Sequence, residues 1–356
     1  MDQQSDVNTN DMSSEGPQHQ EPMLTMAETQ DVRARKKYSS GDNSGAAKFP
    51  DERETNNGSD NKQQCQQQTK QISEDVKGIA TESKISSSDM QLLKWKDMPK
   101  HLQFNPYILT GYRPLSDAWG CVNSITYMHN ETFNIVSHAI PILYILLTVP
   151  QILPWEQTEL SFLAWCHIAG ILCPWVGSFL YHLFMNLRRG PRTYYFLLQV
   201  DMVGIWVSQS FGAMPMIFAT TYCLPNHIKT FLITCYCLFS IWGLYKALIA
   251  WSPWERRLCF LLPFVMRILV WFLRLSKLGG GDPAAFVHVI LQDVVSITGG
   301  AIGALHIPEK WYPGAVDMYL NSHNIMHVMV VAAVYSMHTA TMRDLAWMSK
   351  VKCTAA

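Results

Sequence analysis

Two histidines, His323 and His327, lie near the start of the apolar stretch NSHNIMHVMVVAAVYSM at residues 321–337. On a helix, side chains four residues apart leave the same face about 6 Å from one another. This spacing suits two imidazole ligands of one metal ion. The residues alone leave open a second interpretation, in which the two histidines are only hydrogen-bonded at a membrane boundary.

His182 and Asp201 could complete such a site. Three imidazole nitrogens with a fourth position open to water form the ligand pattern of catalytic zinc. The Asp201 carboxylate could bind the metal directly, or it could hold the water and accept its proton. We therefore predict a Zn²⁺ site formed by His182, His323 and His327, with Asp201 as a catalytic residue, if the fold brings them together.

The elements that must position these residues are long apolar runs. Each run has about 20 residues, the length that spans about 30 Å of hydrocarbon as a helix. Seven of them in succession predict an all-α, polytopic membrane protein with seven transmembrane helices. The runs cover residues 133–153, 162–184, 194–218, 228–250, 258–276, 285–305 and 322–342.

The remaining parts of the 356-residue chain are polar or short. Residues 1–90 are rich in Gln, Ser, Asn, Asp, Glu and Lys and have almost no aromatic side chains, which predicts a disordered cytosolic tail. A juxtamembrane segment is expected at 91–131, the membrane domain at 132–345 and a short tail at 346–356. Within the juxtamembrane segment, residues 116–129 could form a short interfacial helix.

Basic residues in the connections predict the orientation in the membrane. Residues 185–193 contain three arginines and 251–257 contain two, whereas 154–161 and 219–227 contain no Lys or Arg. The positive-inside rule then places the N-terminus in the cytosol and the C-terminus outside the cell or in a lumen. We expect the Golgi or the plasma membrane. Basic residues near the C-terminus, among them Arg343 and Lys350, argue weakly for the opposite orientation.

This topology gathers ionisable residues at one depth. His182 ends the second span, Asp201 starts the third, and the paired histidines start the seventh, so all four lie on the cytosolic side. Glu131 and His138 start the first span at the same depth. They could orient the site from outside its ligands, although capping or packing is an equal alternative. Ionisable residues within a membrane are usually functional.

Four separated blocks resemble the progestin and adipoQ receptor family, which includes adiponectin receptors and haemolysin-III-like proteins. The blocks are ETFNIVSH at 131–138, SFLYHLF at 178–184, VDMVGI at 200–205 and PEKWYPGAVDMYLNSHNIMH at 308–327. The resemblance covers residues 94–347. It implies seven helices, a cytosolic N-terminus and an intramembrane zinc site with ligands at His182, His323 and His327. It also implies a water-holding role for Asp201.

The resemblance adds Ser178, one helical turn before His182, to the expected catalytic residues. Its hydroxyl could bond the substrate oxygen or a water, or it could only bond a carbonyl of its own helix. Related members resemble amidases that cleave ceramide, and others act as receptors. We therefore expect a zinc-dependent lipid amide hydrolase that acts on ceramide or a related membrane lipid, with no nucleic-acid partner. The alternative is a receptor or scaffold in which zinc is purely structural.

The chain departs from the usual pattern of this family at several positions. All the expected ligands are retained, so the departures bear on ligand specificity rather than on the metal. In the first block, Trp and Thr are replaced by Val136 and Ser137. After the second block, Cys-His-Ser is replaced by Asn186, Leu187 and Arg188. The aspartate is flanked by Val200 and Met202 in place of Leu and Tyr, and the Gln between the paired histidines is replaced by Asn324.

Some polar and small residues are expected to have structural roles. Arg267 and Asp293 fall near mid-depth of adjacent spans, where an unpaired charge would be costly, so we expect them to pair. The Gly299–Gly303 spacing predicts tight packing of helices within the fold. The nine cysteines include no CxxC motif, and we expect packing residues rather than a disulfide framework. Packing or boundary roles are also expected for His167, His288, His306 and His338.

Overall fold

The computed structural model describes residues 91–153, 161–250 and 252–353. The predicted tail at 1–90 lies outside these residues. Within them the chain is helical and contains no strand, apart from two isolated bridges that join Leu93 to Tyr112 and Ser116 to Leu187. The predicted all-α class is confirmed.

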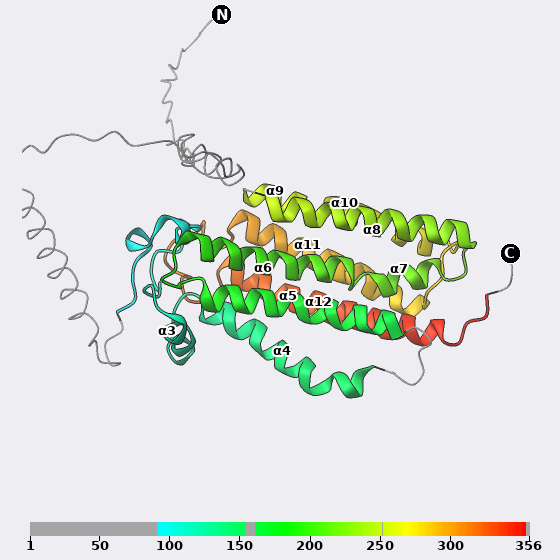
Figure 1. Cartoon of the computed structure of the whole chain (residues 1–356), viewed down its shortest axis with the longest axis horizontal. Coiled ribbons are helices and arrows are strands. Elements are labelled where there is room, and N and C mark those ends of the chain that lie inside the picture. Colours follow the sequence, from blue (N-terminus) through cyan, green and yellow to red (C-terminus); the bar gives the residue numbers. More distant parts are fainter. Residues whose placement is uncertain (1–90, 154–160, 251, 354–356) are drawn as a thin grey trace, which may run out of the picture. The chain divides into compact units, whose positions relative to one another are not determined.

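Long apolar helices run side by side in the described part of the chain (Figure 1). Six segments are long and apolar enough to cross a membrane, and α4 adds a shorter apolar helix over Thr132–Thr148. Together they match the seven predicted spans. The helices are α4 (Thr132–Ile152), α5 (Ser161–Phe184), α6 (Pro191–Ser210) with α7 (Met214–Thr221), α8 (Asn226–Ile249), α9 (Pro253–Leu258) with α10 (Leu261–Leu275), α11 (Phe286–Leu305) and α12 (Ser322–Met348).

Most span boundaries agree with the prediction within a few residues. The largest difference is α12, which continues to Met348, beyond the predicted end of its span at 342. The third span is interrupted between α6 and α7 because Pro215, at the start of α7, has no N–H to continue the hydrogen bonds of α6.

Glycines allow α5 and α6 to approach each other closely. A Cβ on Gly204 of α6 would lie 2.5 Å from the carbonyl oxygen of Cys173. A Cβ on Gly177 of α5 would lie 3.1 Å from the Cα of Asp201. These contacts leave no room for a larger side chain, and they hold Asp201 against the last turns of α5. The backbone packing therefore helps to set the position of a predicted catalytic residue.

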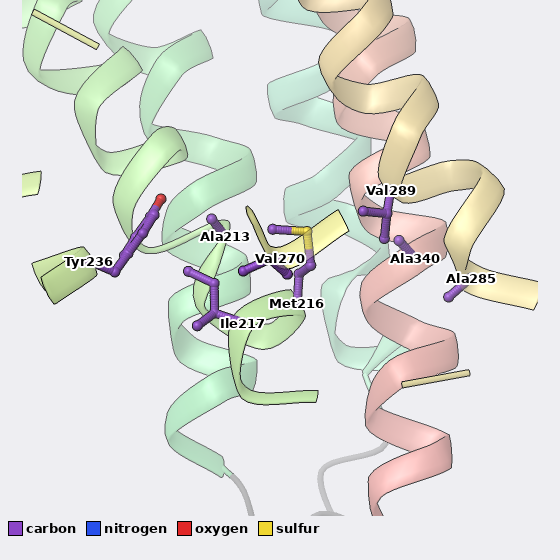
Figure 2. Close-up of a cluster of buried hydrophobic side chains, with 8 residues drawn as sticks. All are labelled: Ala213, Met216, Ile217, Tyr236, Val270, Ala285, Val289 and Ala340. Carbon is purple, nitrogen blue, oxygen red and sulfur yellow. The ribbon is translucent and has the colours of Figure 1, made fainter. Parts of the chain in front are cut away.

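A cluster of buried apolar side chains joins α7 to its neighbours (Figure 2). Met216 and Ile217 of α7 face Tyr236 of α8 and Val270 of α10. Alanines and a valine complete the cluster from the α11 and α12 side. Small residues bring helices close in a membrane, where packing rather than loss of water drives association. The members are Ala213, Met216, Ile217, Tyr236, Val270, Ala285, Val289 and Ala340.

Buried charges within the bundle are paired. Arg267 of α10 and Asp293 of α11 form a 2.7 Å ion pair, as predicted, and Gln209 accepts a further hydrogen bond from Arg267. A second pair, Arg274 with Asp344, joins α10 to α12. Such pairs satisfy groups that would be costly to leave alone in the membrane.

Two predicted packing features are also confirmed. Gly299 and Gly303 of α11 lie against Met329 and Met326 of α12. Among the histidines outside the main cluster, His167 and His338 are hydrogen-bonded to each other, with 2.8 Å between Nε2 and Nδ1.

The expected packing role is wrong for two cysteines, whereas six others in the described residues are free. Cys223, after α7, is bonded to Cys353, after α12. The two residues are 130 positions apart, and their sequence contains no spacing motif, so only the fold reveals that they meet. The bond lies just beyond the last turn of α12, and in Figure 1 that end of α12 lies away from α3 (Ala118–Asn123).

The predicted interfacial helix at 116–129 corresponds to α3 and the short η3 (Ser124–Thr126). Asp117 caps α3 by accepting a hydrogen bond from the Gly120 N–H. Trp119, Ile125 and Met128 of this region are exposed. An exposed apolar surface beside apolar helices fits a segment at the membrane boundary.

Candidate metal centre

Three imidazoles from two helices converge at one end of the bundle. His182 lies near the end of α5, and His323 and His327 lie in the first turns of α12. The Nε2 of His323 is 3.1 Å from that of His182 and 3.2 Å from that of His327. His182 and His327 are each only 2% exposed. These three nitrogens form a group that could hold a metal ion.

The outer nitrogen of His182 is fixed by a carboxylate. Glu131, at the N-terminus of α4, lies with its Oε2 2.8 Å from His182 Nδ1 and also accepts a hydrogen bond from Asn134. Since a carboxylate is only an acceptor, Nδ1 carries the proton and Nε2 presents its lone pair inward. The contact between Glu131 and His182 supports the expected orienting role of Glu131.

The outer nitrogen of His327 is fixed in the same way by a hydroxyl. Ser137 Oγ donates to the carbonyl of Asn134 and lies 3.0 Å from His327 Nδ1. Because its proton is used on the carbonyl, the hydroxyl accepts from Nδ1–H, and His327 Nε2 also presents a lone pair. Ser137 replaces the usual Thr without loss of the hydroxyl. His138 stacks on the same ring, with 4.0 Å between ring centroids.

The donor set fits a transition-metal ion. Tetrahedral zinc with Zn–N bonds of about 2.0–2.1 Å needs neighbouring nitrogens about 3.3 Å apart. The observed separations of 3.1 and 3.2 Å are close to that value. The Nε2 lone pairs of His182 and His327 both face His323. A single Nε2–H on His323 could donate a hydrogen bond to only one of these two acceptors. A cation among the three nitrogens would satisfy all of them.

Ser178 lies on α5, the helix that carries His182, and Asp201 lies on the neighbouring α6. The Asp201 carboxylate interacts electrostatically with His182 but is not one of the atoms that converge on the metal position. Ser178 is buried one turn before His182. The alternative for Ser178 was a hydrogen bond from its hydroxyl to a carbonyl of α5, and no such bond is present in the described residues.

Arg113 holds the end of α5 and was missed by the sequence analysis. Its guanidinium donates to the carbonyl oxygens of His182, at 2.7 Å, and Leu183, at 3.2 Å. It also donates to Ser124 and Asn186. A cation that satisfies the last carbonyls of a helix stabilises its C-terminus. Asn186, one of the departures from the family pattern, therefore takes part in this cap.

Glu309 holds the start of α12 and was also missed. It is fully buried and accepts hydrogen bonds from the Ser322 N–H, at 2.7 Å, from the Ser322 hydroxyl, and from Asn105 Nδ2. Asp317 likewise accepts from the backbone of Leu109 and Thr110. Two acids of the α11–α12 connection therefore fasten the juxtamembrane segment over the histidines.

His129 lies just before α4, outside the membrane span. Burial, with help from the Arg113 guanidinium, lowers the pKa of His129 to about 3. The ring is therefore neutral at pH 7, and its Nδ1 accepts the Glu131 N–H at 3.1 Å. This bond fixes the residue that orients His182.

A bundle of apolar helices with a buried triad of histidines at one end defines a polytopic membrane protein with a candidate metal centre. Comparison with known proteins agrees with this class. Residues 126–338, more than half of the chain, match the family model described as haemolysin-III related, and the chain belongs to that family. The predicted resemblance to progestin and adipoQ receptors is confirmed.

Individual relatives give the same result. The chain is 37% identical over 264 residues to Progestin and adipoQ receptor family member 4 of Homo sapiens, a match that covers 74% of this chain and 96% of that protein. Its identity to the Mus musculus protein of the same name is 36%, with the same coverage. It is also 26% identical to the Adiponectin receptor protein of Drosophila melanogaster, over 71% of this chain and 59% of that protein.

Proposed function

We propose that this protein is a zinc-dependent hydrolase of membrane lipid amides, with ceramide or a related lipid as substrate. The observation that carries the proposal is the convergence of three Nε2 atoms, two of them with lone pairs fixed inward by Glu131 and Ser137. Such an arrangement is typical of a metal site with oriented ligands. An intramembrane position suits a substrate whose acyl chain stays in the bilayer.

Each of the residues has a distinct role in this proposal. His182, His323 and His327 hold zinc, which when bound polarises a carbonyl and lowers the pKa of water to about 7. Asp201 acts as the general base, accepting a proton from the attacking water and delivering it to the leaving amine. Ser178, whose hydroxyl is buried beside His182, binds the substrate carbonyl oxygen.

The orientation proposed from the basic residues has a second support. The bond between Cys223 and Cys353 lies beyond the last turn of α12, whereas His323 and His327 lie in the first turns of that helix. Disulfides persist in extracellular and lumenal compartments and are rare in the cytosol. Both observations favour an outer position for the C-terminus and a cytosolic position for the metal centre.

The proposal is tested by metal analysis and turnover on the same preparation of purified full-length protein. We expect about one zinc per chain and release of sphingosine and fatty acid from ceramide. Chelation should abolish release, and added zinc should restore it. A protein that keeps its zinc and hydrolyses no ceramide would contradict the hydrolase proposal.

A receptor or scaffold with a structural metal is the second candidate. The observation that favours it is the size of the cavity beside His323, about 20 Å³, which has room for about one water rather than a lipid. In this case a ligand would act by shifting the packing of α4, α5 and α12 around the metal. Binding of a lipid without turnover would favour this second function.

A further inference from the structure

A second cavity lies at the opposite end of the bundle from the histidines. It has a volume of about 360 Å³ and is open to the surroundings. Ligand pockets usually have at least about 300 Å³. The residues that line it are Asp282, Arg343, Ala346, Trp347, Lys350 and Val351. Along α12, Arg343 lies 20 residues after His323, a distance of about 30 Å from the metal centre.

Two cations line this cavity. Arg343 and Trp347 lie four residues apart in the last turns of α12, and Lys350 lies in the turn that follows the helix. Both cations are exposed, and in the described residues neither has a carboxylate partner. Asp344, next to Arg343, is already paired with Arg274. Neither cation therefore forms an ion pair within the described residues.

The charges also need an explanation because of where they lie. In the proposed orientation this end is outer, and the positive-inside rule disfavours basic residues beside a span on that side. Membrane insertion thus does not account for Arg343 and Lys350. A negatively charged group that they bind at this surface would account for them.

The cavity also offers groups for a cation. Asp282 accepts a hydrogen bond from the Ala284 N–H at 2.8 Å through one carboxylate oxygen, Oδ1. Its other oxygen accepts no hydrogen bond from the described residues. Trp347 is held by Tyr222, at 6.0 Å between ring centroids, and by Gly280, where a Cβ would lie 2.7 Å from the indole. A fixed indole beside a carboxylate is a suitable environment for an ammonium group.

We propose that this cavity binds the headgroup of a zwitterionic phospholipid from the adjacent leaflet. The phosphate lies on Arg343 and Lys350, which bind phosphate through charge-assisted hydrogen bonds. The ammonium lies between the Asp282 carboxylate and the face of Trp347. Tryptophan is enriched at the level of lipid headgroups, so the cavity lies at a suitable depth. This site is separate from the proposed hydrolase centre.

The test is native mass spectrometry of the purified full-length protein with added short-chain phosphatidylcholine. We expect the wild type to retain phosphatidylcholine more tightly than phosphatidylglycerol, which lacks the ammonium, and not to retain diacylglycerol. The double variant Arg343→Ala, Lys350→Ala should bind phosphatidylcholine about tenfold more weakly or worse, because charged hydrogen bonds are lost. The matched control is Lys352→Ala, which removes a nearby charge that does not line the cavity and should leave binding unchanged.

Two further measurements separate the parts of the proposal. Asp282→Asn should weaken phosphatidylcholine binding and leave phosphatidylglycerol binding unchanged. If the double variant loses its thermal unfolding transition, Lys350→Gln provides the milder test. Unchanged binding by the folded cation variants would overturn the proposal. Equal or tighter binding of phosphatidylglycerol would also overturn it, as would complete displacement of the lipid by an equal concentration of inorganic phosphate.

Discussion

The hydroxyl of Ser137 decides which nitrogen of His327 carries a proton. The hydroxyl oxygen lies 3.0 Å from Nδ1, and the hydroxyl donates its hydrogen bond to the Asn134 carbonyl. Glu131 makes the same choice for His182. The ring nitrogens that face the cluster are thereby kept free as ligands before any ion arrives.

Removal of this hydroxyl should weaken metal binding. We predict that Ser137→Ala lowers zinc affinity by about 10–100-fold, because His327 loses the partner that fixes its tautomer. Ser137→Thr is the matched control, since it keeps the hydroxyl and should bind as the wild type does. Competition with a chelator of known affinity measures the difference. Equal affinities in the Ala and Thr variants would show that the contact has no effect on the metal.

Removal of a proposed ligand should have a larger effect. His323→Ala and His327→Ala are each expected to lose zinc and to lower stability by several kcal/mol, because the ion links α5 to α12. Metal analysis and thermal unfolding measure both effects. The control is His227→Ala, an exposed histidine on α8 that should change neither. Full zinc content in both ligand variants would rule out their role.

A variant of Asp201 can distinguish a role in catalysis from a role in metal binding. Asp201→Asn keeps the shape of the side chain but cannot accept a proton at neutral pH. We expect this variant to keep its zinc and to lose ceramide hydrolysis by about 10²–10⁴-fold, the usual effect of losing a general base. Zinc content and sphingosine release are measured on the same sample. A parallel loss of zinc would instead make Asp201 a ligand.

At the scale of helices, the Arg267–Asp293 pair ties α10 to α11 within the bundle. We predict that Asp293→Ala destabilises the protein by about 3–5 kcal/mol, because it leaves a buried guanidinium without its partner. The double variant Arg267→Met, Asp293→Leu should recover much of this loss, since it removes both charges. Unfolding in detergent measures both variants, and Arg257→Ala, on α9, serves as the control for loss of a cation.

The sequence predicted the spans well because hydropathy and length are local properties. The runs at 162–184 and 285–305, for example, agree with α5 and α11 at nearly every boundary. It also singled out the three histidines, since two share a helix face and the third ends a span at the same depth. The common depth of the three histidines follows from the order and direction of the spans alone.

Other parts of the site could not be predicted because they depend on contacts between distant residues. Glu309 bonds Asn105 from 204 positions away, and Asp317 bonds Leu109 from 208 positions away. Arg113 lies in the juxtamembrane segment, 69 positions before the His182 carbonyl that it binds. A single sequence gives no indication that such residues cap α5 and α12. The same is true of Cys223 and Cys353.

At the scale of the whole molecule, the two ends of the bundle should face different compartments. Glycosylation tags at residue 60 should remain unmodified in cells, whereas tags at the C-terminus should be modified, because the basic residues place only the latter outside the cytosol. A shift in gel mobility that an endoglycosidase reverses measures modification. Modification of the tag at residue 60 would reverse the orientation.

The bond between Cys223 and Cys353 should keep the two parts of the protein joined after a protease cuts the chain between these residues. It turns the segment from α8 to α12 into a covalent ring of about 130 residues, which should by itself contribute about 5 kcal/mol through the reduced entropy of the unfolded chain. A protease that nicks the connection at 277–281 would therefore open the ring without releasing a fragment. His323 and His327 would remain tethered to the half of the protein that carries His182 until a reductant separated them.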